Sequence, residues 1–276
     1  LKHFRTMDSI TPGHPEYGLT PGIEVTTGPL GQGVATAVGF AYGQRFQRSL
    51  LDPEAPEGTS PFDHKVWVIC GEGDVEEGVS SEASSLAGNQ KLGNLTVIFD
   101  ANHIQIEGDS KISFAEDILE RYRAYGWYTD EFSFVQPDGS YKEDTAGFAE
   151  VLERAEKVTD RPKFIKVDTL MAWPTPGKTN NESAHGSKLG PEAVAGLKEV
   201  DPGKSFEVDE EALAHARKVA DRGLEAHKEW DEKFEEWAKA NPDKAALHDR
   251  IHAGRLPEEF NRVIDDLEAT FEAGSS

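Results

Sequence analysis

The chain alternates between short apolar runs and stretches with helical spacing of apolar residues. Apolar runs predict buried strands at residues 65–70, 95–100, 132–135 and 163–170. Helical spacing predicts helices at 31–51, 75–91, 115–125 and 145–158. Strands that alternate with helices of this length predict an α/β fold, in which a parallel sheet carries helices on both faces.

This alternation ends near residue 204. Residues 209–240 form one long charged helical pattern, which Asn241-Pro242 stops, and two shorter helices are expected after it. We therefore expect an α/β domain at 1–204 and a helical linker at 205–276. Residues 173–188 predict a long polar loop, and 197–202 a tightened one.

Composition and charge narrow the class of protein. The chain has 276 residues, 37% of them hydrophobic, and no apolar run approaches the length of a membrane span. A formal charge of −22 argues against nucleic acid as a partner, because phosphates need a basic surface. The single cysteine, Cys70, cannot form an intrachain disulfide, so we expect a cytoplasmic protein with a buried, structural thiol.

Candidate chemistry lies where two of the predicted strands end. Gly71-Glu72-Gly73 follows the first strand, and Asp100-Ala101-Asn102 ends the next. Parallel strands bring their carboxyl ends to one edge of a sheet, where ligands bind in open α/β folds. A carboxylate, a carboxamide and glycines that allow close backbone approach suit a divalent cation that carries a diphosphate.

Four motifs together resemble the transketolase family. The first is Gly71-Glu72-Gly73 followed by Asn102, which we call the strand-end motif and which resembles the thiamine diphosphate fingerprint. The other three are Thr11-Pro12-Gly13-His14-Pro15-Glu16, the stretch 24–33 (EVTTGPLGQG), and Ser183-Ala184-His185-Gly186 with Leu189-Gly190. They occur in the family's order over roughly 180 residues. A dinucleotide-binding domain is disfavoured, because the strand-end motif lacks a third glycine at the expected place.

The resemblance implies a thiamine diphosphate-binding fold and a function. The expected reaction transfers a two-carbon ketol unit from a ketose phosphate, such as xylulose 5-phosphate, to an aldose phosphate, such as ribose 5-phosphate. Thiamine diphosphate is the expected cofactor with Mg²⁺, or alternatively Ca²⁺, at a site shared between the subunits of a homodimer. The resemblance also implies that this chain is part of a longer polypeptide, is inactive alone and needs a pyrimidine-binding domain. Alternatives are a deoxyxylulose phosphate synthase, a dehydrogenase E1 component, or a non-catalytic transketolase-like subunit.

The resemblance also assigns residues to the cofactor and substrate. His14 is expected at the donor sugar, and His185 at the diphosphate and the reacting end of the substrate, both as catalytic residues. Gly73 is expected to offer its N–H group to the diphosphate, and Ile106 to pack on the thiazolium. The turn expected to support the bent cofactor consists of Gly28, Pro29 and Leu30.

The expected metal ligands are Glu72, Asn102 and the carbonyl of Ile104, although the family has aspartate at the first position. Asp74 is an alternative ligand in a shifted register, which we reject because the following residues then no longer match the family. Glu77 and Glu82 are expected at the subunit contact. The histidines without a motif receive no role: His3, His64, His103, His215, His227, His248 and His252.

Overall fold

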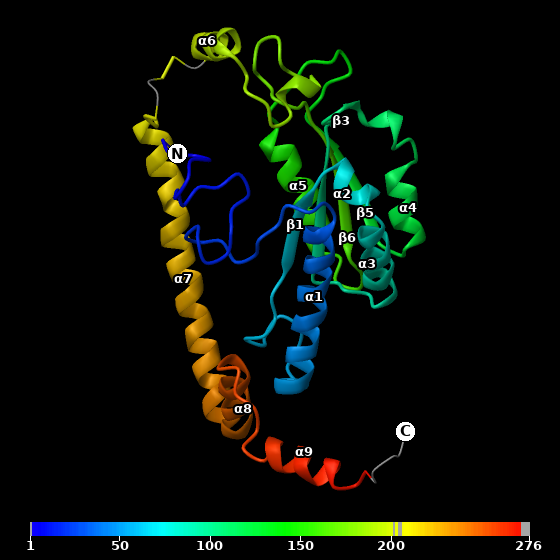
Figure 1. Cartoon of the computed structure of the whole chain (residues 1–276), viewed down its shortest axis with the longest axis vertical. Helices are drawn as coiled ribbons and strands as arrows, with labels where there is room; N and C mark the ends of the chain where they lie inside the picture. Colours follow the sequence, from blue (N-terminus) through cyan, green and yellow to red (C-terminus); the bar gives the residue numbers. More distant parts are fainter. Residues whose placement is uncertain (1, 201, 204–205, 272–276) are drawn as a thin grey trace. The chain divides into compact units, whose positions relative to one another are not determined.

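A sheet of four parallel strands forms the centre of the described chain, residues 2–200, 202–203 and 206–271, in the computed structural model (Figure 1). In sheet order the strands are β1 (Val66–Cys70), β2 (Leu95–Ala101), β6 (Lys163–Asp168) and β5 (Tyr128–Ser133). Cys70 lies opposite Phe99, and Ala101 lies opposite Asp168. The strands therefore end at a common edge, and the predicted parallel α/β sheet is confirmed.

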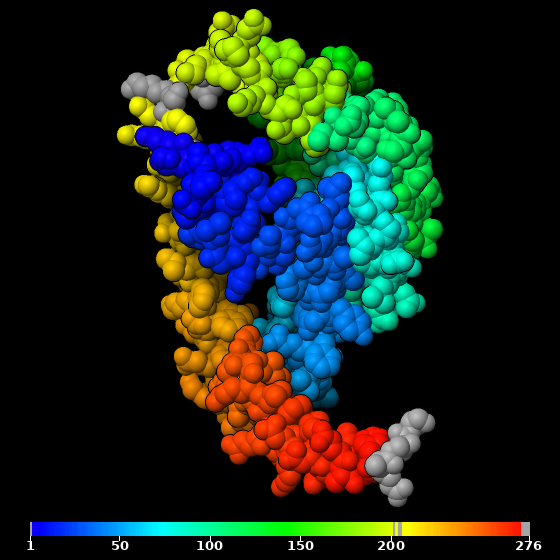
Figure 2. Space-filling model, in the orientation of Figure 1, coloured from blue at the N-terminus to red at the C-terminus, as the bar shows by residue number. Residues whose placement is uncertain are grey.

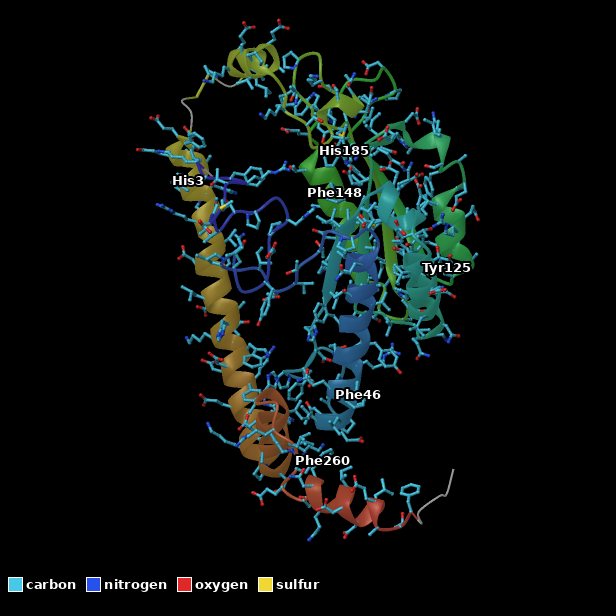
Figure 3. The ribbon with its side chains drawn as sticks, viewed as in Figure 1. His3, Phe46, Tyr125, Phe148, His185 and Phe260 are labelled. Carbon is cyan, nitrogen blue, oxygen red and sulfur yellow. The ribbon has the colours of Figure 1, made fainter. Side chains whose placement is uncertain are left out.

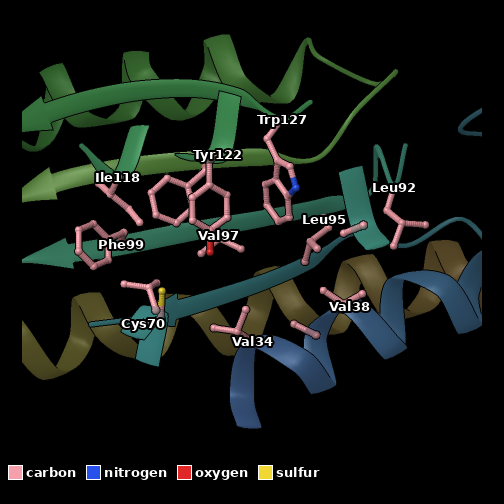
Figure 4. Packing of buried hydrophobic residues seen from close by; sticks show 14 of the residues in the cluster. Val34, Val38, Cys70, Leu92, Leu95, Val97, Phe99, Ile118, Tyr122 and Trp127 are labelled. Carbon is pink, nitrogen blue, oxygen red and sulfur yellow. The ribbon is translucent and has the colours of Figure 1, made fainter. Parts of the chain in front are cut away.

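Helices cover both faces of this sheet, because alternate side chains of each strand point to opposite sides. One face packs against α1 (Gln32–Leu51), α3 (Gly78–Asn89) and α4 (Ile118–Ala124). Tyr122 of α4 is buried on this face and stacks on Phe164 with ring centroids 3.6 Å apart (Figure 4). The other face packs against α5 (Thr145–Glu156), through Val151 and Ala155. Full burial of one large apolar side chain contributes about 1.5–3 kcal/mol, so these layers hold the strand ends in place.

The chain divides into two compact units. We call the first, Leu1–Arg45 with His64–Ala216, the α/β unit, and the second, Phe46–Asp63 with Arg217–Ser276, the helical unit. The helices after the sheet are α6 (Pro191–Val200), α7 (Glu210–Ala240), α8 (Pro242–His252) and α9 (Phe260–Glu268). The long helix and the two shorter ones after it are therefore confirmed, whereas the division at residue 204 stays a prediction.

The helical unit has its own small core. Leu51, Phe62 and Trp237 are buried there, and Phe234 packs against them. Trp230 donates its indole N–H to the carbonyl of Pro61 at 2.8 Å. No helix in the described part of the chain combines the length and apolar character needed to cross a membrane.

The helix predicted at 75–91 is wrong in one respect, because it is two helices. A short helix, α2 (Glu72–Glu76), begins directly after β1, and α3 begins at Gly78. Glu77 between them has extended backbone angles, φ −67° and ψ 135°. The Asp74 carboxylate accepts a hydrogen bond from the N–H of Gly71 at 3.0 Å, which stabilises the early helix start. This local contact is invisible to hydrophobic periodicity.

Three other predicted boundaries are also wrong. The strand predicted at 132–135 is β5, which lies earlier because its pairing with β6 runs from Tyr128 to Ser133. The helix predicted from residue 115 begins at Ile118, where the Asp117 side chain accepts from the N–H of Glu120. The loop predicted at 197–202 is helical through Val200 in α6, and residue 201 lies outside the described residues.

Candidate functional site

The ends of β1 and β2 meet through Glu72. Its carboxylate oxygen Oε1 accepts a hydrogen bond from the backbone N–H of His103 at 2.8 Å. This bond joins the segment after β1 to the residue that follows Asn102, although the two lie about thirty positions apart in the chain. The expected convergence of the two strand ends is therefore present in the structure.

Glu72 is a buried acid, and few nearby groups offset the cost of burying its charge. Its side chain is only 4% exposed. Burial raises the pKa of Glu72, and the hydrogen bond from His103 opposes this rise. The His103 ring lies close by, with Nδ1 4.0 Å from Glu72 Oε1 and Nε2 3.5 Å from Asp168 Oδ1. A buried carboxylate in this setting is stabilised in its charged form by a cation.

The side chain of Asn102 is held in place by two hydrogen bonds. Its Nδ2 donates to Asp100 at 3.1 Å, and its Oδ1 accepts from the N–H of Ile104 at 3.0 Å. Asp100 in turn accepts from the hydroxyl of Thr169. An amide oxygen has two lone pairs, so Oδ1 retains one for a metal ion. Ile104 itself begins a two-stranded hairpin, β3 (Ile104–Gln105) with β4 (Gly108–Asp109).

A cleft of about 530 Å³ opens beside this cluster. The residues that line it include Glu72, Phe99, His103 and Lys166. Lys166 is paired with Asp168 at 3.0 Å. The buried carboxylate of Glu72 therefore borders a space that solvent or a ligand can enter.

The glycine-rich turn before α1 packs against the start of α3. Gly31 has φ 76°, and a Cβ built there would lie 2.8 Å from both Glu77 Cβ and Ser80 Oγ. Its N–H group donates to Asp74 Oδ1 at 2.9 Å, while the other oxygen of Asp74 accepts from Gly71. Asp74 therefore ties the turn to the end of β1, and each of its oxygens accepts one of the two hydrogen bonds.

One residue of the predicted turn, Leu30, lies beside the diphosphate candidate, Gly73. The Leu30 side chain covers Gly73 so closely that a Cβ built there would lie 3.0 Å from Leu30 Cδ1. His14 lies beside Gly28, with its ring 3.5 Å from the position of a Gly28 Cβ. Residues 2–30 form largely exposed loops that Figure 2 shows in dark blue. The sequence-distant motifs at 11–16 and 24–33 are thus neighbours in space.

The other predicted site residues are exposed in the described chain. His185 follows the short 3₁₀ helix η2 (Glu182–Ala184) in the loop after β6, where its side chain is exposed (Figure 3). Ile106 lies in the turn of the β3–β4 hairpin and is 66% exposed. The remaining exposed members of the set are His14, Gly28, Pro29, Leu30, Glu77 and Glu82.

Comparison with known proteins gives the family. The family model described as transketolase, thiamine diphosphate binding domain, matches residues 1–257. The chain belongs to the transketolase family. The transketolase of Mycobacterium tuberculosis (strain ATCC 25618 / H37Rv) is 48% identical over 271 residues, which cover 97% of this chain and 38% of that relative. The transketolase of Geobacillus stearothermophilus is 39% identical, covering 100% of this chain and 40% of that relative.

Solved transketolases share the fold. The transketolase from Leishmania mexicana superposes with a TM-score of 0.85 at 36% identity, covering all of this chain and 39% of that one. The Pichia stipitis enzyme, in a complex with sedoheptulose 7-phosphate, gives a TM-score of 0.83 at 35% identity and covers 95% of this chain and 38% of that one. This chain therefore spans about two fifths of the length of the transketolases that it matches.

Sequence reasoning missed two residues of this candidate site. It assigned no role to His103, whose backbone N–H and ring both lie at Glu72. Its position directly after Asn102 was the available signal. It also considered Asp74 only as a metal ligand, whereas the structure shows it bonded to the N–H groups of Gly31 and Gly71.

Proposed function

We propose that this chain provides the diphosphate- and metal-binding part of a transketolase active site. The observation that supports the proposal is the hydrogen bond from the His103 N–H to Glu72, which joins the end of β1 to the segment of Asn102 and Ile104 after β2. Leu30 covers Gly73 close by. In the proposed reaction, a two-carbon ketol unit passes from a ketose phosphate to an aldose phosphate. Thiamine diphosphate supplies the electron sink for breaking the carbon–carbon bond.

The donor set fits a hard cation. In the described residues, no cluster of three His, Cys, Asp or Glu side chains is arranged around a metal position. The proposed ligands are instead one carboxylate, one amide oxygen and one backbone carbonyl, which is the oxygen chemistry that Mg²⁺ and Ca²⁺ prefer. The raised pKa of the buried Glu72 supports this fit, because a bound cation would stabilise its charged form.

Glu72 is one methylene longer than the aspartate of the family pattern. We propose that it ligates the metal with a weaker preference for Mg²⁺ than aspartate would give, because Mg²⁺ demands short distances in near-ideal octahedral geometry. Ca²⁺ accepts longer and more variable distances, so it is the alternative ion.

The remaining residues have proposed roles around the cofactor. Gly73 offers its N–H group to the diphosphate, and the turn of Gly28, Pro29 and Leu30 supports the cofactor's bent form. His14 and His185 hydrogen-bond the substrate or exchange protons with it, as imidazoles do near neutral pH. Ile106 packs on the thiazolium, a role that its exposure in this chain leaves room for.

The partners of the site are also proposals. Glu77 and Glu82 are exposed and are placed at the contact of a homodimer, where the second subunit completes the site. We propose that residues 1–204 form the binding domain and 205–276 a linker to a pyrimidine-binding domain. This chain alone is then expected to show no turnover of xylulose 5-phosphate with ribose 5-phosphate. Activity that returns on mixing with a protein carrying that domain supports the proposal, and activity of this chain by itself contradicts it.

A binding measurement tests the metal ligand directly. Thiamine diphosphate is titrated calorimetrically into the active assembly that contains this chain, with Mg²⁺ or Ca²⁺. We expect Glu72→Ala to abolish metal-dependent binding and Glu72→Asp to strengthen the dependence on Mg²⁺. Asp74→Asn serves as the control, because it removes a neighbouring charge without removing a proposed ligand. The reverse pattern would move the metal site to Asp74.

A further inference from the structure

Two histidines that the proposed function does not use lie together on one helix. His248 and His252 are four residues apart in α8, so they share a face of that helix. Their ring centroids are 4.2 Å apart. Both belong to the helical unit, and neither contributes to the thiamine diphosphate cluster.

The first of these rings is held firmly by its surroundings. The His248 side chain is 12% exposed. Its ring contacts Phe234 with centroids 4.9 Å apart and Phe62 with centroids 5.8 Å apart. It is therefore a fixed group, in contrast to His252, which is exposed at the end of the helix.

A neighbouring carboxylate sets the tautomer of His248. Its Nδ1 atom lies 3.2 Å from Asp249 Oδ1. A carboxylate accepts hydrogen bonds, so this contact favours the tautomer in which Nδ1 is the donor and the lone pair lies on Nε2. Metal-binding histidines commonly have this arrangement, in which a carboxylate fixes the ring and increases the basicity of the ligating nitrogen.

We propose that His248 and His252 form a binding site for a divalent transition-metal ion of the Zn²⁺ or Cu²⁺ type. Imidazole nitrogens prefer these ions to Mg²⁺ or Ca²⁺. Histidines at positions i and i+4 of a helix can chelate one ion, as in helical zinc motifs. Rotation of the exposed His252 side chain brings its nitrogen to the same ion as His248 Nε2.

The site is open and exchangeable, not a closed structural site. In the described residues, no third His, Cys, Asp or Glu converges with the pair, so water completes the coordination. A structural zinc site would have four protein ligands. The proposed ligand is therefore a divalent transition-metal ion that binds reversibly to the two histidines and exchanges with ions in solution.

Zinc titration of the purified chain tests this proposal. The chain is treated with a chelator, dialysed and titrated with Zn²⁺ by calorimetry in excess Mg²⁺, which occupies oxygen-rich sites. The decisive variant is His252→Ala, because the side chain is exposed and its loss leaves the aromatic cluster intact. We expect one saturable site per chain in the wild type. Loss of a supporting residue lowers metal affinity by about 10–100-fold, so loss of a ligand is expected to lower it by at least tenfold.

The matched control is His227→Ala on α7. His227 is also exposed and also has an acidic neighbour, Asp231 at 2.9 Å, but no histidine lies three or four residues from it in the sequence of α7. Its loss is expected to leave zinc affinity unchanged, whereas His252→Cys, which restores a ligand, is expected to recover binding. The Cu²⁺ form should show nitrogen hyperfine coupling in its electron paramagnetic resonance spectrum, and His252→Ala should weaken it. Absence of saturable binding in the wild type, or equal affinity in His252→Ala and the wild type, overturns the proposal.

Discussion

Replacement of Asp74 by alanine should destabilise the α/β unit through two lost hydrogen bonds. One bond is donated by Gly31 at 2.9 Å and the other by Gly71 at 3.0 Å. A hydrogen bond to a charged group contributes about 1.5–3 kcal/mol, and a contact at a helix start about 0.5–2 kcal/mol. Asp74 is half-buried, so solvent screens part of this sum. We expect Asp74→Ala to lower the free energy of unfolding by about 2–4 kcal/mol.

Thermal unfolding followed by circular dichroism measures this loss. For a unit of this size, 1 kcal/mol corresponds to roughly 2–4 °C, so the Tm should fall by about 5–15 °C. Asp74→Asn should lose about half as much, because the two bonds use different oxygens and asparagine keeps one oxygen. The matched control is Glu107→Ala, which removes an exposed acid from the β3–β4 turn. Equal Tm values for Asp74→Ala and Glu107→Ala, within about 2 °C, would refute the reasoning.

Three further predictions concern a glycine, a buried lysine and a histidine. Gly31→Ala should cost about 2–4 kcal/mol, because its φ of 76° and the 2.8 Å approach of Glu77 Cβ both oppose a side chain. Gly18 also has a positive φ, 80°, but no atom lies within 4 Å of a Cβ built there, so Gly18→Ala should cost only about 1 kcal/mol. Urea unfolding measures both losses, and equal losses for Gly31→Ala and Gly18→Ala would contradict the argument. Burial lowers the pKa of Lys163 to about 8 from an ordinary 10.5. Between about pH 8 and pH 10.5 the unfolded chain therefore binds more protons at this residue than the folded chain does. The contribution of Lys163 to the free energy of unfolding thus rises with pH across this range. Lys163→Met should remove that part of the slope in urea unfolding across this pH window, and identical slopes would exclude it. In an active assembly that contains this chain, His185→Ala should lower kcat/KM by roughly 10²–10⁴ with an unchanged Tm, and early melting with full activity of the folded fraction would make His185 structural.

The sequence determined the fold class and the meeting of two strand ends at the candidate site. Apolar runs and helical spacing depend on burial, so they predicted the parallel sheet and the helices on both of its faces. The strand-end positions of Glu72 and Asn102 followed from the same pattern, because parallel strands end at one edge. The buried thiol of Cys70 also followed, and burial with nearby carboxylates raises its pKa.

Only the tertiary structure decided the contacts that lie between distant segments. The bond from the N–H of His103 to Glu72 and the two bonds to Asp74 depend on the paths of loops, which hydrophobic periodicity does not encode. The early start of α2 and the position of β5 likewise follow from a capping contact and from strand register. The pairing of His248 with His252 required the bounds of α8, because four-residue spacing brings two rings together only inside a helix. Sequence pattern reports which residues are buried, whereas hydrogen bonds and ring contacts depend on where the folded backbone places them.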